Sequence, residues 1–477
     1  MVGFRLAIAA IFLLAASHAP AQEPSKQSLD RQYQSAVTDF SAGRFSQAVA
    51  KLEPLLPYAT RSFEVHELIG LSYASLSETQ KAEAHLKLAV QIAPNSVPAR
   101  TNFGTLLLQE GKVALAAEQF RYALQLDPES YDANHNLAEI YIRQGKLAAA
   151  HPLLAKAQSV NPASYGNGYN LALTDYMLGK LDDALSMAKS MLAIHNTAEL
   201  HNLIGHIEEK DGRFVEAANA YEIAAHLNPS EDNLFDWGSE MLLHRTYDPA
   251  IEIFETAAER YPKSPRMQIG LGLANYFRGK YDEAVKALLR AIDLDPADPR
   301  AYMFLARAYD SSPTEADNVI ERFKRYVDLK PNDARAQYYY AMSLWKGKRS
   351  GNAGADLTKV MDLLKSAIAL DDNLADAHLE LGDLYSGQHQ YEKAIPQYVR
   401  ALELDANLSD AHYRLGTSYV HLGKKEEAQK EFAIYQKLRT EHLAKLEKER
   451  DEIKQFVYSE SGGDAASRNT QSGVENP

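Results

Sequence analysis

Cysteine is absent from the 477 residues of this chain, and tryptophan occurs only twice. The absence of cysteine excludes disulfide bonds, thiol nucleophiles and zinc sites built from thiolates. Positive charge is also scarce, because 51 Lys and Arg residues face 64 Asp and Glu residues, which gives a formal net charge of -13. The composition therefore predicts no general attraction to nucleic acid or to an anionic bilayer.

Long apolar runs are missing as well, and the nearest approach to one is LAIAAIFLLAA, residues 6–16. This run is too short for a hydrocarbon core that needs about 20 residues. It follows Arg5 and precedes Ala19-Pro20-Ala21, an order typical of a cleavable export signal. We predict a signal peptide over 1–21, cleavage after Ala21, and a periplasmic or secreted protein without a membrane span. A signal that stays attached is the alternative.

Recognisable catalytic motifs are the third absence. The sequence contains no H-E-x-x-H, no G-x-S-x-G and no G-x-x-x-x-G-K-[ST]. His201 and His206 are five residues apart, which places them poorly on one helical face, so a structural role is favoured over metal ligation. We therefore predict that the protein is not an enzyme and uses no cofactor or metal.

What the chain does contain is a repeated pattern with a period near 34 residues. The segment GKYDEAVKALLRAIDLDP, 279–296, shares its small, aromatic or aliphatic and proline positions with 111–128, 145–162 and 212–229. A period of this length indicates a stacked array of structural units. Each unit has two helical segments with one apolar stripe each, and an Asn-Pro or Asp-Pro pair predicts where the second helix ends.

Small residues mark the inside of each unit. When a unit is counted from the start of its first helix, the eighth place is Gly or Ala: Gly70, Gly104, Ala138, Ala172, Gly205, Gly238, Gly272, Ala306, Ala341, Gly382 and Gly416. Alanine recurs twelve residues later, and the twenty-fourth place carries larger side chains such as Phe120, Tyr221, Phe254 and Tyr398. We predict that the small residues allow close helix packing and that the larger ones fill the adjacent space.

These recurring Gly/Ala, Tyr, Ala and Pro positions resemble the tetratricopeptide repeat family over residues 29–440, as an exported bacterial-type member. The resemblance implies an all-α fold: an α-solenoid in which about twelve helix-turn-helix repeats form a right-handed superhelix. We expect 22–28 to be a short linker, 441–458 to extend a C-terminal capping helix, and 459–477 to be a disordered tail. Little of the chain is then left for a catalytic domain.

Two kinds of irregularity interrupt the pattern. Asn196, Asp372 and Ala406 stand where proline is usual, which predicts mild local losses. The segment WKGKRSGNAGADLTK, 345–359, makes one unit longer, and its glycines and polar residues predict a projecting loop in place of helix.

The resemblance also implies where a partner binds. First helices line a concave groove, and residues at the second, fifth, ninth, twelfth and thirteenth places should face it. Aromatic, methionine and basic residues at those places are the predicted anchors: Tyr169, Tyr176, Phe235, Tyr276, Phe277, Arg300, Met303, Arg307, Arg335, Tyr338, Met342, Trp345 and Lys346.

Core packing is the alternative for several of these anchors. Tyr176 and Tyr276 stand one place later than the family's usual tyrosine, so a small shift would bury both. The same alternative holds for Phe277, Tyr338 and Trp345, and one residue of the run Tyr338 to Tyr340 must be core because a helix turns its successive side chains in different directions.

The sequence as a whole predicts a non-enzymatic scaffold that binds a peptide or protein in the groove, with no nucleic acid partner. The family's lysine and asparagine clamp for a terminal carboxylate does not occur in this chain. The alternative function is an assembly factor or subunit of a cell-envelope machine for secretion, pili or exopolysaccharide, which acts through its convex surface or C-terminal helix. Oligomeric state and partner identity are not predicted.

Overall fold

The structure is a computed structural model that describes residues 25–312, 314–349 and 357–441. The predicted signal peptide, the extension over 442–458 and the tail over 459–477 lie outside these residues. All regular structure in the described segments is helical, and none of the described helices is long and apolar enough to cross a membrane. Helix α1 begins at Lys26, so the end of the predicted linker is helical.

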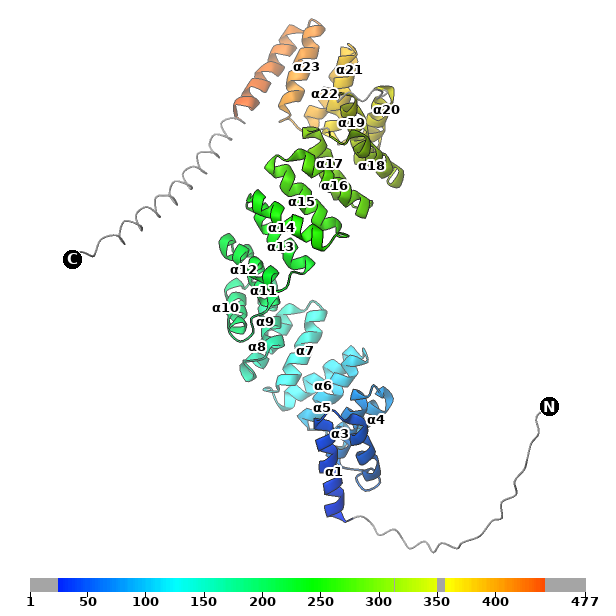
Figure 1. Cartoon of the computed structure of the whole chain (residues 1–477), viewed down its shortest axis with the longest axis vertical. Helices are drawn as coiled ribbons and strands as arrows, with labels where there is room; N and C mark the ends of the chain where they lie inside the picture. The colour runs from blue at the N-terminus through cyan, green and yellow to red at the C-terminus, as the bar shows by residue number, and fades with distance from the viewer. Residues whose placement is uncertain (1–24, 313, 350–356, 442–477) are drawn as a thin grey trace, which may run out of the picture. The chain divides into compact units, whose positions relative to one another are not determined.

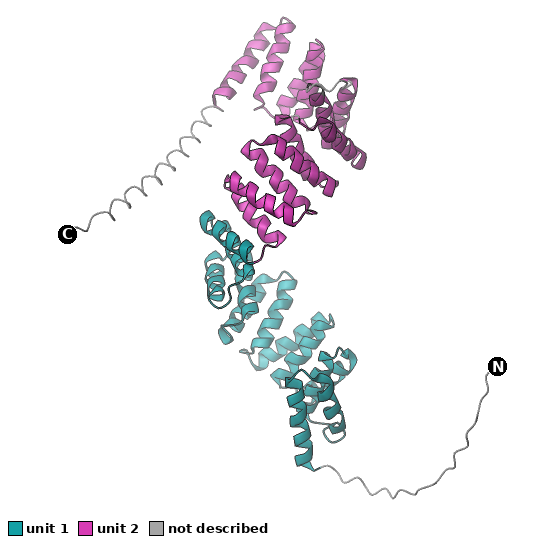
Figure 2. Ribbon diagram, in the orientation of Figure 1, with its two compact units in different colours: residues 1–227 teal, residues 228–477 magenta. Residues whose placement is uncertain are grey.

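The chain divides into two compact units, residues 1–227 and 228–477 (Figure 2). The helices of the first unit are α1 (Lys26–Ser41), α2 (Phe45–Leu52), the 3-10 turn η1 (Glu53–Leu55), α3 (Phe63–Ser75), α4 (Thr79–Ile92), α5 (Val97–Gln109), α6 (Val113–Leu126), α7 (Tyr131–Arg143), α8 (Leu147–Val160), α9 (Tyr165–Met177), α10 (Leu181–Leu192), α11 (Ala198–Lys210) and α12 (Phe214–Leu227). Consecutive helices pair as hairpins that stack on the next pair (Figure 1).

The second unit is built in the same way. Its helices are α13 (Glu231–Leu243), α14 (Tyr247–Arg260), α15 (Pro265–Arg278), α16 (Tyr281–Leu294), α17 (Pro299–Ser311), α18 (Ala316–Leu329), α19 (Ala334–Arg349), α20 (Leu357–Leu370), α21 (Ala375–Gly387), α22 (Tyr391–Leu404) and α23 (Ser409–His421), and a further helix covers 425–441. Each unit is therefore an α-solenoid of helix hairpins, as predicted, with the last helix packed after α23.

Hydroxyl side chains fix where many first helices begin. Ser96 precedes α5, and its oxygen accepts a hydrogen bond from the Ala99 amide at 3.3 Å. The same arrangement occurs at Ser62, Ser130, Ser164, Thr197 and Ser230. Such caps satisfy amides that have no partner inside the helix, and each contributes about 1 kcal/mol.

The eighth-place prediction is confirmed by the contacts of the glycines. A Cβ atom added to Gly104 would lie 2.7 Å from the Phe120 ring, and one added to Gly205 would lie 2.5 Å from the Tyr221 ring. Five further pairs repeat this sixteen-residue relation: Gly70 with Leu86, Gly238 with Phe254, Gly272 with Leu288, Gly382 with Tyr398, and Gly416 with Phe432. The twenty-fourth-place side chain therefore occupies the space above the eighth-place glycine.

Polar side chains at the fourth place bond to the preceding turn in several hairpins. Arg100 donates to the Pro94 carbonyl at 2.7 Å, six residues earlier, and Asn134 donates to the Pro128 carbonyl at 2.9 Å. Gln337 does the same to Pro331 at 3.2 Å. These buried groups are satisfied by the turn that the proline creates, which is why polar residues are tolerated there.

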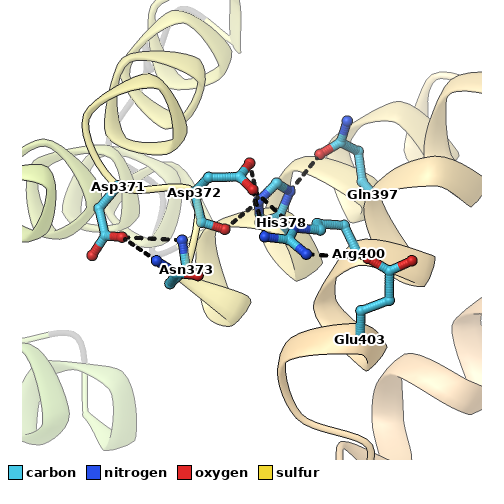
Figure 3. Close-up of polar contacts among 7 residues, drawn as sticks. All are labelled: Asp371, Asp372, Asn373, His378, Gln397, Arg400 and Glu403. Atoms are coloured by element: carbon cyan, nitrogen blue, oxygen red, sulfur yellow. Dashed lines mark hydrogen bonds and ion pairs between the residues drawn. The ribbon is translucent and has the colours of Figure 1, made fainter.

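Histidine takes the fourth place where that proline is missing. His378 reaches the Asp372 carbonyl at 3.3 Å, and His412 reaches the Ala406 carbonyl at 3.2 Å. Figure 3 shows His378 between Asp372 and Gln397, with Arg400 bonded to the Asp372 carboxylate. The helices α20 and α22 still end at Leu370 and Leu404 although no proline follows them. At both turns the histidine contact is present in place of the proline.

The prediction of a projecting loop over 345–359 is wrong at both ends. Helix α19 continues through Arg349, and α20 begins at Leu357. Residues 350–356 lie outside the described residues. Trp345 packs against the hydrophobic cluster of Val360, Leu364 and Leu381, and this burial outweighs the poor helix propensity of Gly347.

Candidate functional site

One cavity of the second unit, with a volume of about 490 Å³, is lined mainly by first helices. Its lining residues are Met303, Ala306, Arg307, Tyr309 and Asp310 of α17, Phe323 of α18, Arg335, Tyr338, Tyr339, Met342, Ser343 and Lys346 of α19, Leu374, and Asp376 and Glu380 of α21. We call it the α17–α21 cavity. Helices α19 and α21 each pack closely on the second helix that follows them, whereas α18 packs mainly on α19 and only slightly on α17.

Six of the predicted anchors meet in this cavity. They are Met303, Arg307, Arg335, Tyr338, Met342 and Lys346, and they occupy the second, fifth, ninth and thirteenth places of two consecutive repeats. The spacing rule therefore brings together side chains that are up to 43 residues apart in the sequence.

The prediction missed seven polar or aromatic residues of the same cavity, which include Phe323 and Ser343. Asp310 and Asp376 stand at the twelfth and second places, so the spacing rule could have found them if carboxylates had been included. Tyr309, Tyr339 and Glu380 stand at places that the rule does not name, and no sequence signal distinguishes them from core residues.

Three predicted anchors of the second unit lie elsewhere. Trp345 lines a separate cavity of about 310 Å³ with Asp383 and Tyr413. Phe277 is 51% exposed and stacks on Tyr247 with the ring centroids 5.9 Å apart. Tyr276 is half-buried against the hydrophobic core, so core packing, the alternative for this residue, applies to part of its side chain. Its ring lies edge-on to Phe277.

Two more anchors of this unit have intramolecular partners. The exposed Arg300 forms an ion pair with Asp298 at 2.7 Å. The ring of Phe235 lies edge-on to Phe254 and under the guanidinium of Arg266, 5.1 Å from its centre. Neither side chain lines the α17–α21 cavity.

The anchors predicted in the first unit are half-buried. Tyr169 and Tyr176 both pack against the cluster that contains Leu200 and Leu203, and Lys210 lies 4.6 Å from the centre of the Tyr176 ring. Core packing, the alternative predicted for Tyr176, therefore covers much of the surface of this side chain.

The α17–α21 cavity carries charges of both signs near two tyrosines. Burial raises the pKa of Tyr339, while the guanidinium groups of Arg335 and Arg307 oppose that rise and the carboxylates of Asp333 and Asp376 add to it. Burial raises the pKa of Tyr338 much further, and the carboxylates of Asp376 and Glu380 reinforce the effect. We call Arg307 and Arg335, on α17 and α19, the basic side of the cavity and Asp376 and Glu380, on α21, its acidic side, while Lys346 forms an ion pair with Asp310.

Tyr309 adds a buried donor to the cavity. Its side chain is 2% exposed, and its hydroxyl has no hydrogen-bond partner in the described part of the chain. Burial raises the pKa of Tyr309 to about 12, so the hydroxyl keeps its proton at neutral pH. A buried donor without an acceptor costs about 1–3 kcal/mol, which an acceptor atom from a bound partner would offset.

These side chains are suited to binding a protein or peptide. Met303 and Met342 supply adaptable apolar surface, the tyrosines supply rigid rings, and the arginines supply donors. Among the residues that the structure describes, no group of three or more His, Asp or Glu side chains is placed to hold a metal ion. The fold and this cavity define the class of helical-repeat interaction scaffolds.

Comparison with family models identifies the family within that class. Models described as "Tetratricopeptide repeat" match residues 33–97, 107–164, 243–299, 274–334 and 410–442, and one described as "TPR repeat" matches 387–423. The chain belongs to the tetratricopeptide repeat family.

Solved structures of repeat proteins are similar at low identity. YrrB, described as a TPR protein with an unusual peptide-binding site, is 20% identical, with 39% of this chain and 97% of that chain covered and a TM-score of 0.35. PilW, described as a type IV pilus biogenesis factor, is 22% identical, with 44% and 97% covered and a TM-score of 0.38. A Naa15/Naa10 complex bound to HypK is 17% identical, with 85% and 68% covered and a TM-score of 0.35. No curated protein matches the chain.

Proposed function

We propose that this protein is an exported, non-enzymatic scaffold that binds a peptide segment of a partner protein in the α17–α21 cavity. The observation that carries the proposal is the meeting of Met303, Met342 and Tyr338 with two arginines in one open cavity on adjacent first helices. Apolar and aromatic groups with nearby donors are typical of the energetic centres of protein interfaces.

Partner capture tests the role of the cavity. Tagged protein beginning at Gln22 is used to capture partners from a cell-envelope extract, and a Met303→Gln, Met342→Gln variant is compared with it. Because glutamine keeps the length of methionine but loses its apolar contacts, we expect the variant to lose the captured partner. Leu329→Gln with Leu370→Gln is the matched control, since both leucines are exposed at the ends of second helices. Equal capture by all three proteins would reject the cavity as the binding site.

Two further measurements test the proposal. The first distinguishes binding in the cavity from assembly through the C-terminal helix, and the second tests whether the protein is exported. Deletion of 436–477 should leave capture unchanged if the cavity is the binding site, but should abolish it if the C-terminal helix joins an envelope assembly. Export is tested by N-terminal sequencing of the protein recovered from the periplasm or the medium, which should begin at Gln22. Recovery of the full-length chain from the cytoplasm would contradict export.

A further inference from the structure

The basic side of the α17–α21 cavity has hydrogen-bond donors without intramolecular acceptors. Arg307 and Arg335 are exposed, and neither guanidinium has a hydrogen bond or ion pair with another described residue. Some other arginines of this unit are held by carboxylates, as Arg278 is by Asp248 at 2.7 Å and Arg400 by Asp372 at 2.6 Å. The two cavity arginines therefore remain available to a ligand.

Tyr309 points to the same ligand chemistry independently. Its hydroxyl is buried, has no acceptor in the described residues, and belongs to the lining of the cavity. The two guanidinium groups can only donate and the hydroxyl can donate as well as accept, so a ligand group that accepts hydrogen bonds can satisfy all three. A carboxylate fits best, because it accepts several hydrogen bonds at once and also offsets the positive charge.

The acidic side limits how much negative charge the ligand can carry. Asp376 and Glu380 lie on α21, and Asp310 already neutralises Lys346. A run of acidic residues or a nucleic acid strand would bring further anions against these carboxylates, and like charges that are partly removed from water repel strongly. Met303 and Met342, in contrast, offer an apolar surface beside the arginines.

We infer that the α17–α21 cavity recognises a partner segment with a single acidic side chain next to a bulky apolar one. Arg307 and Arg335 bind the carboxylate, Tyr309 donates to an acceptor atom of the segment, and the apolar side chain packs on Met303 and Met342. This inference rests on the proposed peptide-binding function, and it specifies the chemistry of the partner.

Fluorescence anisotropy with defined peptide pools tests the inference on protein beginning at Gln22. Each labelled pool has eleven residues with the centre Met-Xaa-Leu, where Xaa is Glu, Gln or Lys, and flanks of mixed neutral residues. A fourth pool adds three further Glu residues. We expect the Glu pool to bind about tenfold or more tightly than the Gln pool, because hydrogen bonds to a charged group contribute about 1.5–3 kcal/mol. The pool with four Glu residues should bind no more tightly than the pool with one.

Charge reversal identifies the residues responsible. The Arg307→Glu, Arg335→Glu variant should prefer the Lys pool to the Glu pool. The control Lys324→Glu, Lys330→Glu makes the same change in net charge at exposed positions of α18 and its end, and it should keep the preference for Glu. Tyr309→Phe should weaken binding of the Glu pool severalfold while its circular dichroism spectrum stays unchanged.

The outcomes separate the inference from the proposed function. Binding of the Glu and Gln pools with equal affinity would overturn the inference and leave the peptide-binding function intact. Tightest binding by the pool with four Glu residues would also overturn it, since it would show a polyanion site. Binding by no pool, together with partner capture that the Met303→Gln, Met342→Gln variant retains, would overturn both.

Discussion

At the scale of single residues, the fold depends on a size complementarity that is repeated along the chain. Glycine at the eighth place faces a ring or leucine at the twenty-fourth place, as Gly205 faces Tyr221. Where the eighth place is alanine, the twenty-fourth place varies: it is Ala188 for Ala172 and Leu154 for Ala138. The rings at Phe120, Tyr221, Phe254, Tyr398 and Phe432 all face glycine, because the helices of one hairpin lie too close for a ring and a Cβ atom together.

Gly205→Ala should therefore destabilise the first unit by about 1–3 kcal/mol. Its added Cβ would lie 2.5 Å from the Tyr221 ring, whose hydroxyl is hydrogen-bonded to Glu209 at 2.8 Å and to His206 at 2.7 Å and so resists displacement. Gly166→Ala is the control, because no atom lies within 4 Å of its added Cβ. It should be neutral or stabilise by about 0.5 kcal/mol. Urea denaturation of both variants measures the difference, and equal stabilities would contradict the packing argument.

At the scale of the helical element, the turns between hairpins use two interchangeable devices. Proline closes most of them, and a fourth-place histidine contacts the turn at Asp372 and at Ala406. At Asn196 the contact is through the side chain, which lies 2.8 Å from the ring of His201. His201, His378 and His412 therefore hold turns, whereas His206 bonds to the Tyr221 hydroxyl inside its own hairpin.

Ala406→Pro should stabilise the second unit by about 0.4–1 kcal/mol. The preceding Asp405 has φ -143° and ψ 99°, nearly the same as Asp127 with φ -142° and ψ 98°, which is followed by Pro128 in the sequence. Proline therefore fits here without strain, and it restricts the unfolded chain. Thermal denaturation measures the gain. Asn407→Pro is the control and should destabilise, because it removes an amide that donates to Asp405 at 2.9 Å.

A buried histidine pair between α3 and α4 makes this hairpin sensitive to acid. His66 and His85 lie 3.0 Å apart at Nδ1, and burial lowers the pKa of both below the ordinary value, with His66 lowering that of His85 further. The unfolded histidines bind protons first as the pH falls below about 6.5, so the stability is complete above this pH and is lost below it.

Hydrogen exchange of α3 and α4 at pH 7.5 and 5.5, corrected for intrinsic exchange rates, measures this loss. Protection should fall at pH 5.5 in the wild type. His85→Gln should lose less protection, because glutamine already serves this place at Gln397, where it lies 2.8 Å from His378. An equal loss in the variant would show that another group causes the acid sensitivity.

Regular features were predictable from the sequence, and irregular ones were not. Small residues recur at the eighth place, as at Gly104, often enough for the sequence to indicate the twenty-fourth-place partner, which is Phe120 in this repeat. The cavity was predicted in part, because the 34-residue spacing also gives the positions of α17 and α19 that face the groove. Tyr309 and Tyr339 were missed, since they stand at the eleventh and sixth places, which the groove rule does not name. The helical end of α19 was missed because burial of Trp345 overrides local propensity.

At the scale of the whole molecule, each compact unit has hydrophobic clusters of its own. The first contains one cluster around Leu52, Leu86 and Phe120. The second contains one around Leu288, Tyr302 and Phe323. In a repeat array each hairpin is stabilised by its immediate neighbours, so a fragment that keeps whole hairpins keeps most of its stabilising contacts.

Division after Leu227 should therefore give a first unit that folds as a separate chain. The fragment 25–227 ends with the complete hairpin of α11 and α12, in which Tyr221 fills the space above Gly205. The fragment 25–212 removes α12 and exposes the face of α11 around Gly205, on which Tyr221 packs, so it should unfold at a lower urea concentration. Circular dichroism during urea denaturation compares the two. A fragment 25–227 without cooperative unfolding, or one no more stable than 25–212, would show that the hairpin is not the unit of stability in this chain.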